Sequence, residues 1–187
     1  MRAARLSLLT AFLTLTLAAT PASDRNIVAR AAEQQVGVTV HYDPAYVKLQ
    51  YPGGDVPRDR GVCSDVVIRA FRAIGVDLQR ELHEDMKRSF KAYPQLWGLT
   101  GPDKNIDHRR VPNLMTFLSR RGKSVQGEFA PGDIVAWRLP GGLYHIGIVG
   151  TTTAPRSHNR IVVHNIGRGA RAEDVLHAYT IIGHYRW

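Results

Sequence analysis

An amphipathic helix is predicted by the stretch CSDVVIRAFRAI, residues 63–74, and this stretch decides the fold. Its apolar positions recur at the spacing of one helix face, and they are Cys63, Val67, Ala70, Phe71 and Ile74. Gly75 follows directly and suits the end of a helix. A helix with one apolar face must bury that face against a second layer, so a partner layer is expected elsewhere in the chain.

The partner layer is predicted after Pro131, where the hydrophobic period changes from that of helices to that of strands. Four strands are expected, at residues 133–138, 145–150, 160–165 and 178–185. Helical patterns cover residues 23–35, residues 77–92 and a short segment after Pro112. Helices followed by strands predict an α+β domain with an antiparallel sheet.

The chain has 187 residues and no internal repeat, which predicts one domain over residues 23–187. Residues 1–22 differ from the rest: Arg2 and Arg5 precede an apolar run at 6–19, and small residues follow. This pattern predicts a secretory signal peptide and a periplasmic or secreted product. The run of about 14 residues is shorter than the roughly 20 that a spanning helix needs, so an uncleaved anchor is the weaker alternative. No stable membrane insertion is expected after cleavage.

The charge balance favours an anionic partner, because 25 basic residues stand against 16 acidic ones and give a net charge of +9. The basic residues are scattered among the aromatic ones without an ordered array, so no nucleic-acid partner is expected. One cysteine and no His-Glu-x-x-His pattern make a zinc site unexpected, and no phosphate-binding glycine loop appears. We therefore expect no metal and no cofactor, and we favour polymers of the bacterial envelope as partners.

The single cysteine, Cys63, has three possible interpretations in an exported protein: an inert buried thiol, half of an intermolecular disulfide, or a nucleophile. Its place in the first turn of a helix favours the thiolate, because unpaired backbone N–H groups and the helix dipole stabilise negative charge there. We therefore expect a depressed pKa for this thiol. A nucleophile in this position needs a base on the opposing sheet.

The predicted strands supply two histidines, His145 and His164, on neighbouring segments of the sheet. A thiol, one imidazole as base and a second as its orienting group form a catalytic arrangement of the triad type. Each histidine alone is more simply explained as a satisfied interior residue or an exposed strand end. The constellation of all three favours function. Asn165, beside His164, is an alternative third residue.

These residues resemble those of a known family. Tyr51–Gly54 and Gly61–Val67 resemble the tyrosine, glycine pair and cysteine-serine helix start of the NlpC-type cysteine peptidases. Pro131–Val135 is similar to their proline-glycine-aspartate strand entry, and His145–Val149 to their catalytic histidine strand. The span from Val38 to Trp187 also resembles an uncharacterised bacterial envelope family of the same papain-like group, through residues 61–72, 105–114, 132–137, 164–169 and 183–186.

The resemblance implies a papain-like, NlpC-type fold and a cysteine peptidase or amidase that cleaves an amide bond in peptidoglycan. It implies Cys63 as nucleophile, His145 as base and His164 as third polar residue. It also implies that three residues position the substrate or the oxyanion: Tyr51, Ser64 and Asp65. The alternative is a non-catalytic module that binds peptidoglycan or muropeptides on the same fold, although binding alone needs no thiolate. A thiol redox protein lacks its resolving cysteine.

One further segment, Asp107–Arg110, contains a histidine between charged residues and could bind a metal or an anionic substrate group. A solvated loop is the default interpretation of such a charged run. The segment also recurs in the resembling envelope family.

Overall fold

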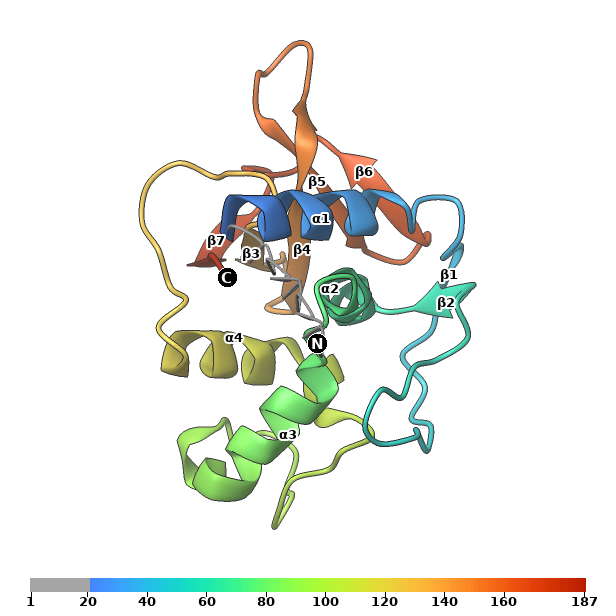
Figure 1. The fold of residues 1–187 in the computed structure, drawn as a ribbon, viewed down its shortest axis with the longest axis vertical. Helices are drawn as coiled ribbons and strands as arrows, with labels where there is room; N and C mark the ends of the chain where they lie inside the picture. The colour runs from blue at the N-terminus through green and yellow to red at the C-terminus, as the bar shows by residue number, and fades with distance from the viewer. Residues whose placement is uncertain (1–20) are drawn as a thin grey trace, which may run out of the picture.

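Four α-helices precede the main sheet in the computed structural model, which describes residues 21–187 (Figure 1). The helices are α1 (Pro21–Glu33), α2 (Cys63–Arg72), α3 (Leu78–Ser89) and α4 (Val111–Arg120), with the 3-10 turns η1 (Phe90–Ala92) and η2 (Asp107–Arg109) between α3 and α4. Two short parallel strands, β1 (His41–Tyr42) and β2 (Arg60–Gly61), lie between α1 and α2. The order of elements confirms the predicted sequence of helices followed by strands.

The main sheet has five strands in the order β6-β5-β4-β3-β7, and all neighbours are antiparallel. The strands are β3 (Ile134–Arg138), β4 (Tyr144–Thr153), β5 (Arg160–Asn165), β6 (Ala170–Glu173) and β7 (Thr180–Tyr185). The α+β class with an antiparallel sheet is therefore confirmed. Strand β6 was not predicted, because Ala-Arg-Ala-Glu contains none of the β-branched or aromatic residues that indicate strands.

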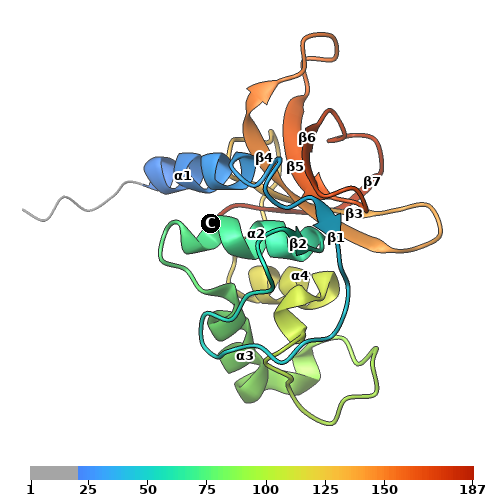
Figure 2. The same cartoon turned by 90° about the vertical axis from the view of Figure 1, so that its right-hand side faces the viewer.

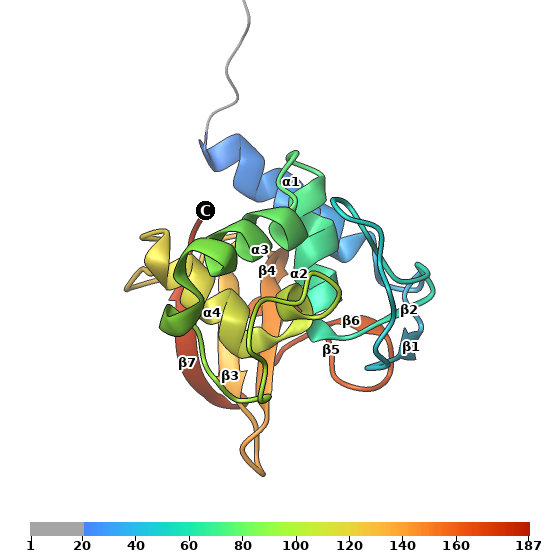
Figure 3. The ribbon, with the colours of Figure 1, turned by 90° about the horizontal axis from the view of Figure 1, so that it is seen from below.

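The helices cover one face of the sheet. Both α1 and α2 contact β4, and α4 contacts β4 and β7 (Figures 1 and 2). Helix α3 contacts α2 and α4 and lies on the outer side of this helical layer (Figure 3). The core between helices and sheet includes Phe71, Leu114, Phe117, Ile146 and Ile148, all fully buried. Helix α2, which was predicted from residues 63–74, therefore lies at the centre of the core.

The opposite face of the sheet is also covered, by the connection between β6 and β7. Leu176 of this connection packs in a second cluster with Val135, Trp137, Val149 and Val162. The indole Nε1 of Trp137 donates to the carbonyl of Leu176 at 3.0 Å. Because both faces are buried, β4 has a continuous buried run, which explains its nearly unbroken apolar sequence.

The predicted signal peptide, residues 1–22, falls largely outside the described residues, and α1 begins at Pro21. Among the described residues no helix is both long enough and apolar enough to cross a membrane.

Candidate active site

Helix α2 begins at Cys63, as predicted, and a carboxylate of its own first turn fixes that start. The side chain of Asp65 accepts a hydrogen bond from the backbone N–H of Val62 at 2.7 Å. This bond satisfies one of the amides that the first turn of a helix leaves unpaired. Cys63 therefore occupies the first helical position, and its residue is only 5% exposed.

A buried ion pair holds this helix start against η2. The carboxylate of Asp65 accepts from Nε and Nη2 of Arg109, each at 3.0 Å, and both side chains are almost fully buried. Arg109 also donates to the carbonyl oxygens of Asp43 and Ala45, each at 2.9 Å. Ser64 Oγ donates to the carbonyl of Arg109 at 2.7 Å. The polar groups of Ser64 and Asp65 are thus engaged in fixing α2, η2 and the 43–45 segment together.

The default interpretation of Asp107–Arg110 as a solvated loop is wrong. Asp107, His108 and Arg109 are buried in η2, between 1% and 6% exposed. Their charges are compensated inside the protein, since Arg109 pairs with Asp65 and Arg110 pairs with Asp107 at 2.9 Å. A charged run gives no sign in the sequence of which partners will bury it.

The two predicted histidines lie side by side on the sheet. Nε2 of His145, on β4, is 2.8 Å from Nδ1 of His164, on β5. Nε2 of His164 is in turn 2.9 Å from a carboxylate oxygen of Glu173, on β6. Trp137 stacks on His145 with ring centroids 5.5 Å apart. The structure therefore brings the predicted pair together and adds Glu173, which the sequence analysis missed because its strand was not predicted.

Cys63 meets β4 at the residue after His145. The backbone N–H of Ile146 is near enough to the sulfur to lower the pKa of the thiol. Cross-strand pairing with Trp137 places His145 on the sheet face opposite the one that α2 covers. Within residues 21–187, no hydrogen bond joins Cys63 to His145 directly.

Burial controls the protonation of both groups. It raises the pKa of the Cys63 thiol to about 12, and the nearby amides of Ile146, Ser64 and Cys63 itself oppose this rise without cancelling it. Burial, reinforced by the neighbouring His164, lowers the pKa of His145 to about 3. The resting site therefore holds a neutral thiol and a neutral imidazole. The expected depressed thiol pKa is wrong, because removing a thiolate from water costs more than the helix start returns.

A cleft of about 350 Å³ opens at Cys63. Its walls are mainly apolar and aromatic: Tyr42, Pro44, Val62, Leu96, Trp97, Ile106, Val111, Pro112 and Tyr144 line it with Cys63, Arg109 and Arg110. The guanidinium of Arg110 lies over the ring of Trp97, 4.2 Å from its centroid. A substrate in this cleft would meet the thiol among groups that exclude water.

Two tyrosines line this cleft, Tyr42 and Tyr144, and Tyr51 does not. Burial and the nearby Cys63 raise the pKa of Tyr42. The hydroxyl of Tyr51 instead donates to Glu84 of α3 at 2.7 Å, and its ring contacts His83. The structure thus does not bring Tyr51 together with Cys63. Tyr42 belongs to none of the motifs that the sequence analysis singled out, so no sequence signal identified it.

Asn165 has a separate part in the site. Its side-chain amide donates to the carbonyl of Gly61 at 2.9 Å and to that of His41 at 3.3 Å. These bonds tie the end of β5 to β1 and β2, directly before the start of α2. His164, and not Asn165, is the group bonded to the imidazole of His145.

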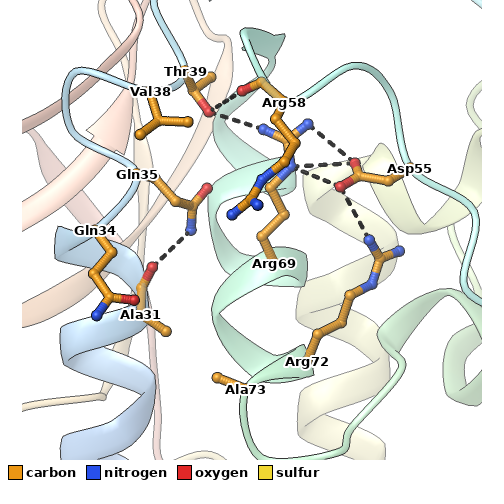
Figure 4. A pocket seen from close by; sticks show the side chains of 10 residues that line it. All are labelled: Ala31, Gln34, Gln35, Val38, Thr39, Asp55, Arg58, Arg69, Arg72 and Ala73. Carbon is orange, nitrogen blue, oxygen red and sulfur yellow. Dashed lines mark hydrogen bonds and ion pairs between the residues drawn. The ribbon is translucent and has the colours of Figure 1, made fainter.

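A larger pocket, of about 430 Å³, lies between α1 and the C-terminal half of α2 (Figure 4). The side chains of Arg69 and Arg72 point toward Asp55 and pair with it, and Arg69 donates to both carboxylate oxygens of Asp55 and to Thr39 (Figure 4). These contacts satisfy the guanidinium within the protein. Cys63 lines the smaller cleft and does not line this pocket, so the smaller cleft is the candidate site.

These features define an α+β protein in which helices cover an antiparallel sheet and a single cysteine lies buried at a helix start. The chain belongs to the family described as "Domain of unknown function (DUF1287)", which matches residues 29–187. It is similar to "Uncharacterized protein YijF" of Escherichia coli (strain K12), with 52% identity over 198 residues, covering 98% of this chain and 96% of that protein. The family match includes all the residues of the candidate site.

Proposed function

We propose that this protein is an exported thiol hydrolase of the papain-like, NlpC-type group, which cleaves an amide bond in bacterial peptidoglycan. One observation carries the proposal. Cys63 lines a cleft at the first position of α2, and its sulfur meets β4 at the residue after His145, whose ring is bonded to His164. A nucleophile, a base and an orienting group are the parts that acyl transfer requires.

The chemistry starts from neutral groups. A substrate bound in the cleft brings its carbonyl carbon to the sulfur, and His145 removes the thiol proton as the carbon–sulfur bond forms. The amides of the first turn of α2 can donate to the oxyanion that develops. Because burial lowers the pKa of His145 to about 3, its imidazolium is a strong acid and readily protonates the leaving amine. Water then hydrolyses the thioester, with the same imidazole as base.

The substrate class rests on location and charge. Removing residues 1–22 takes away Arg2 and Arg5 and no acidic residue, so the net charge falls from +9 to +7 and stays basic. A basic exported protein is attracted to the anionic polymers of the envelope. The motifs around Cys63 and His145 resemble those of enzymes that cleave cell-wall peptides. Together these features favour peptidoglycan stem peptides over other amides.

A second candidate is a peptidoglycan-binding module without catalysis. Two observations favour it: burial raises the thiol pKa to about 12, and among the described residues no hydrogen bond links Cys63 to His145. On this hypothesis the cleft holds a stem peptide and the thiol is a buried structural group. The hydrogen-bonded histidines His145 and His164 would then contribute only to the stability of the sheet.

The deciding experiment incubates the processed protein with purified sacculi and identifies released fragments by mass spectrometry. Cys63→Ala is the test variant, and Tyr51→Phe, outside the cleft, is the matched control. The proposal expects fragments from the wild type and the control, and none from Cys63→Ala. Sedimentation with sacculi without any released fragment would favour the binding module. Equal cleavage by folded Cys63→Ala would eliminate the thiol mechanism.

A further inference from the structure

The relay of His145, His164 and Glu173 contains two hydrogen bonds whose donors are not interchangeable. An ionised carboxylate can only accept, so the bond of 2.9 Å to Glu173 requires a proton on Nε2 of His164. Burial lowers the pKa of His164 despite the opposing effect of Glu173, so the ring carries one proton at neutral pH. Nδ1 of His164 is then unprotonated and must accept.

This constraint passes to the next ring. Because Nδ1 of His164 accepts, the bond of 2.8 Å requires Nε2 of His145 to donate its proton. His145 is also neutral, since burial lowers its pKa to about 3. A neutral imidazole has one N–H, so Nδ1 of His145 carries the free lone pair. This nitrogen is the atom that can act as a base.

We propose that Glu173 is a positioning residue that sets the proton pattern of both histidines and so leaves Nδ1 of His145 free to accept the thiol proton. The effect on turnover rests on the proposed function, whereas the proton pattern does not. Without the carboxylate, the reverse pattern fits the same heavy-atom positions. His164 then donates from Nδ1, His145 accepts at Nε2, and Nδ1 of His145 carries a proton that blocks it as a base.

Glu173 is accessible enough to be replaced without opening the core. Its side chain is 38% exposed on the edge strand β6, whereas that of His164 is 1% exposed. Glu173→Lys places a group there that can only donate, so it should impose the reverse pattern on both rings. Asp174→Lys is the matched control, because Asp174 is the neighbouring carboxylate and contacts Ser157 and Asn159 instead of a histidine. Glu173→Gln keeps an acceptor and should preserve the wild-type pattern in part.

The experiment records long-range ¹H–¹⁵N correlation spectra of the histidine rings in the processed protein at pH 7, where protonated and unprotonated nitrogens are well separated. Signals are assigned with His145→Ala and His164→Ala. We expect unprotonated Nδ1 of His145 in the wild type and in Asp174→Lys, and protonated Nδ1 in Glu173→Lys. Cleavage of muropeptides should fall about 100-fold or more in Glu173→Lys. This loss in rate lies between the loss caused by removing a group that supports an active-site residue and the loss caused by the wrong tautomer of a catalytic histidine.

The outcomes separate this inference from the proposed function. A protonated Nδ1 of His145 in the wild type, or a pattern that Glu173→Lys leaves unchanged, would overturn the inference. The expected patterns in a wild-type protein that cleaves no muropeptide would uphold it and refute the hydrolase. Equal spectral changes in Glu173→Lys and Asp174→Lys would assign the effect to charge at the edge of the sheet, and would also overturn it.

Discussion

Iodoacetamide should alkylate Cys63 in the native protein far more slowly than in the unfolded chain at neutral pH. The ordinary pKa of the thiol is 9.0, and burial raises it to about 12 in the fold. Three pH units correspond to about 1,000-fold less thiolate at any pH below 9, because each unit is a factor of ten. The thiolate is the species that iodoacetamide attacks, so the rate should fall by about the same factor.

The assay measures carbamidomethylation by mass spectrometry between pH 5 and pH 9, with and without urea. The native rate should rise tenfold per pH unit throughout this range, whereas the unfolded chain should level off near pH 9. A native rate that reaches a plateau below pH 7 would refute this reasoning. It would mean that a thiolate–imidazolium pair between Cys63 and His145 exists at rest, and that the helix start outweighs burial.

Three other predictions concern packing in the sheet, the role of Tyr42 in the cleft, and the dependence of stability on pH. Gly147→Ala should cost about 1–3 kcal/mol and roughly 2–10 °C in Tm, because its Cβ would lie 2.8 Å from a methyl of Val162 on β5. Gly101→Ala is the control, because Gly101 has open space around it, and calorimetry should show no change in its free energy of unfolding or its Tm. Tyr42→Phe should slow muropeptide cleavage more than Tyr51→Phe; equal rates would refute a role for the Tyr42 hydroxyl. Acidification from pH 6.5 to 4.5 should lower the unfolding free energy by about 2–3 kcal/mol through His145, since the unfolded chain binds a proton there and the fold does not until about pH 3. In urea titrations, His145→Ala should reduce this pH dependence.

Most of the fold could be predicted because its elements carry strong periodic signals. Helix α2 begins at the predicted residue and ends at Arg72, two residues before the predicted end at residue 74. Gly75, which follows, adopts a positive φ of 75°. Strand β5 has the predicted bounds of 160–165. Strand β6 could not be predicted, because pairing with β5 and not its own sequence keeps it extended. Short edge strands of small and charged residues lack a pattern of their own.

The site could be predicted only in part, for a related reason. Cys63, His145 and His164 were singled out because each stands in a segment with a recognisable pattern, and the hydrogen bond between the two histidines shows that their rings lie side by side. The protonation of the thiol was mispredicted, since the depth of burial depends on packing that sequence spacing does not contain. Glu173 was missed because it approaches His164 from β6, the strand that was not predicted, although that strand directly follows β5 in the chain.

The polar groups around the start of α2 bear on the choice between an inert thiol and a nucleophile. Asp65 and Arg109 form a buried ion pair, which is weak evidence for stability because desolvation offsets much of the attraction. Its geometric effect is clearer, since it fixes the first turn of α2 while Asn165 ties the preceding strand to β5. A thiol that merely fills a core needs no such positioning, because small apolar side chains would serve there equally well. The placement of several buried polar groups around one cysteine, at the mouth of a cleft, therefore favours the nucleophile.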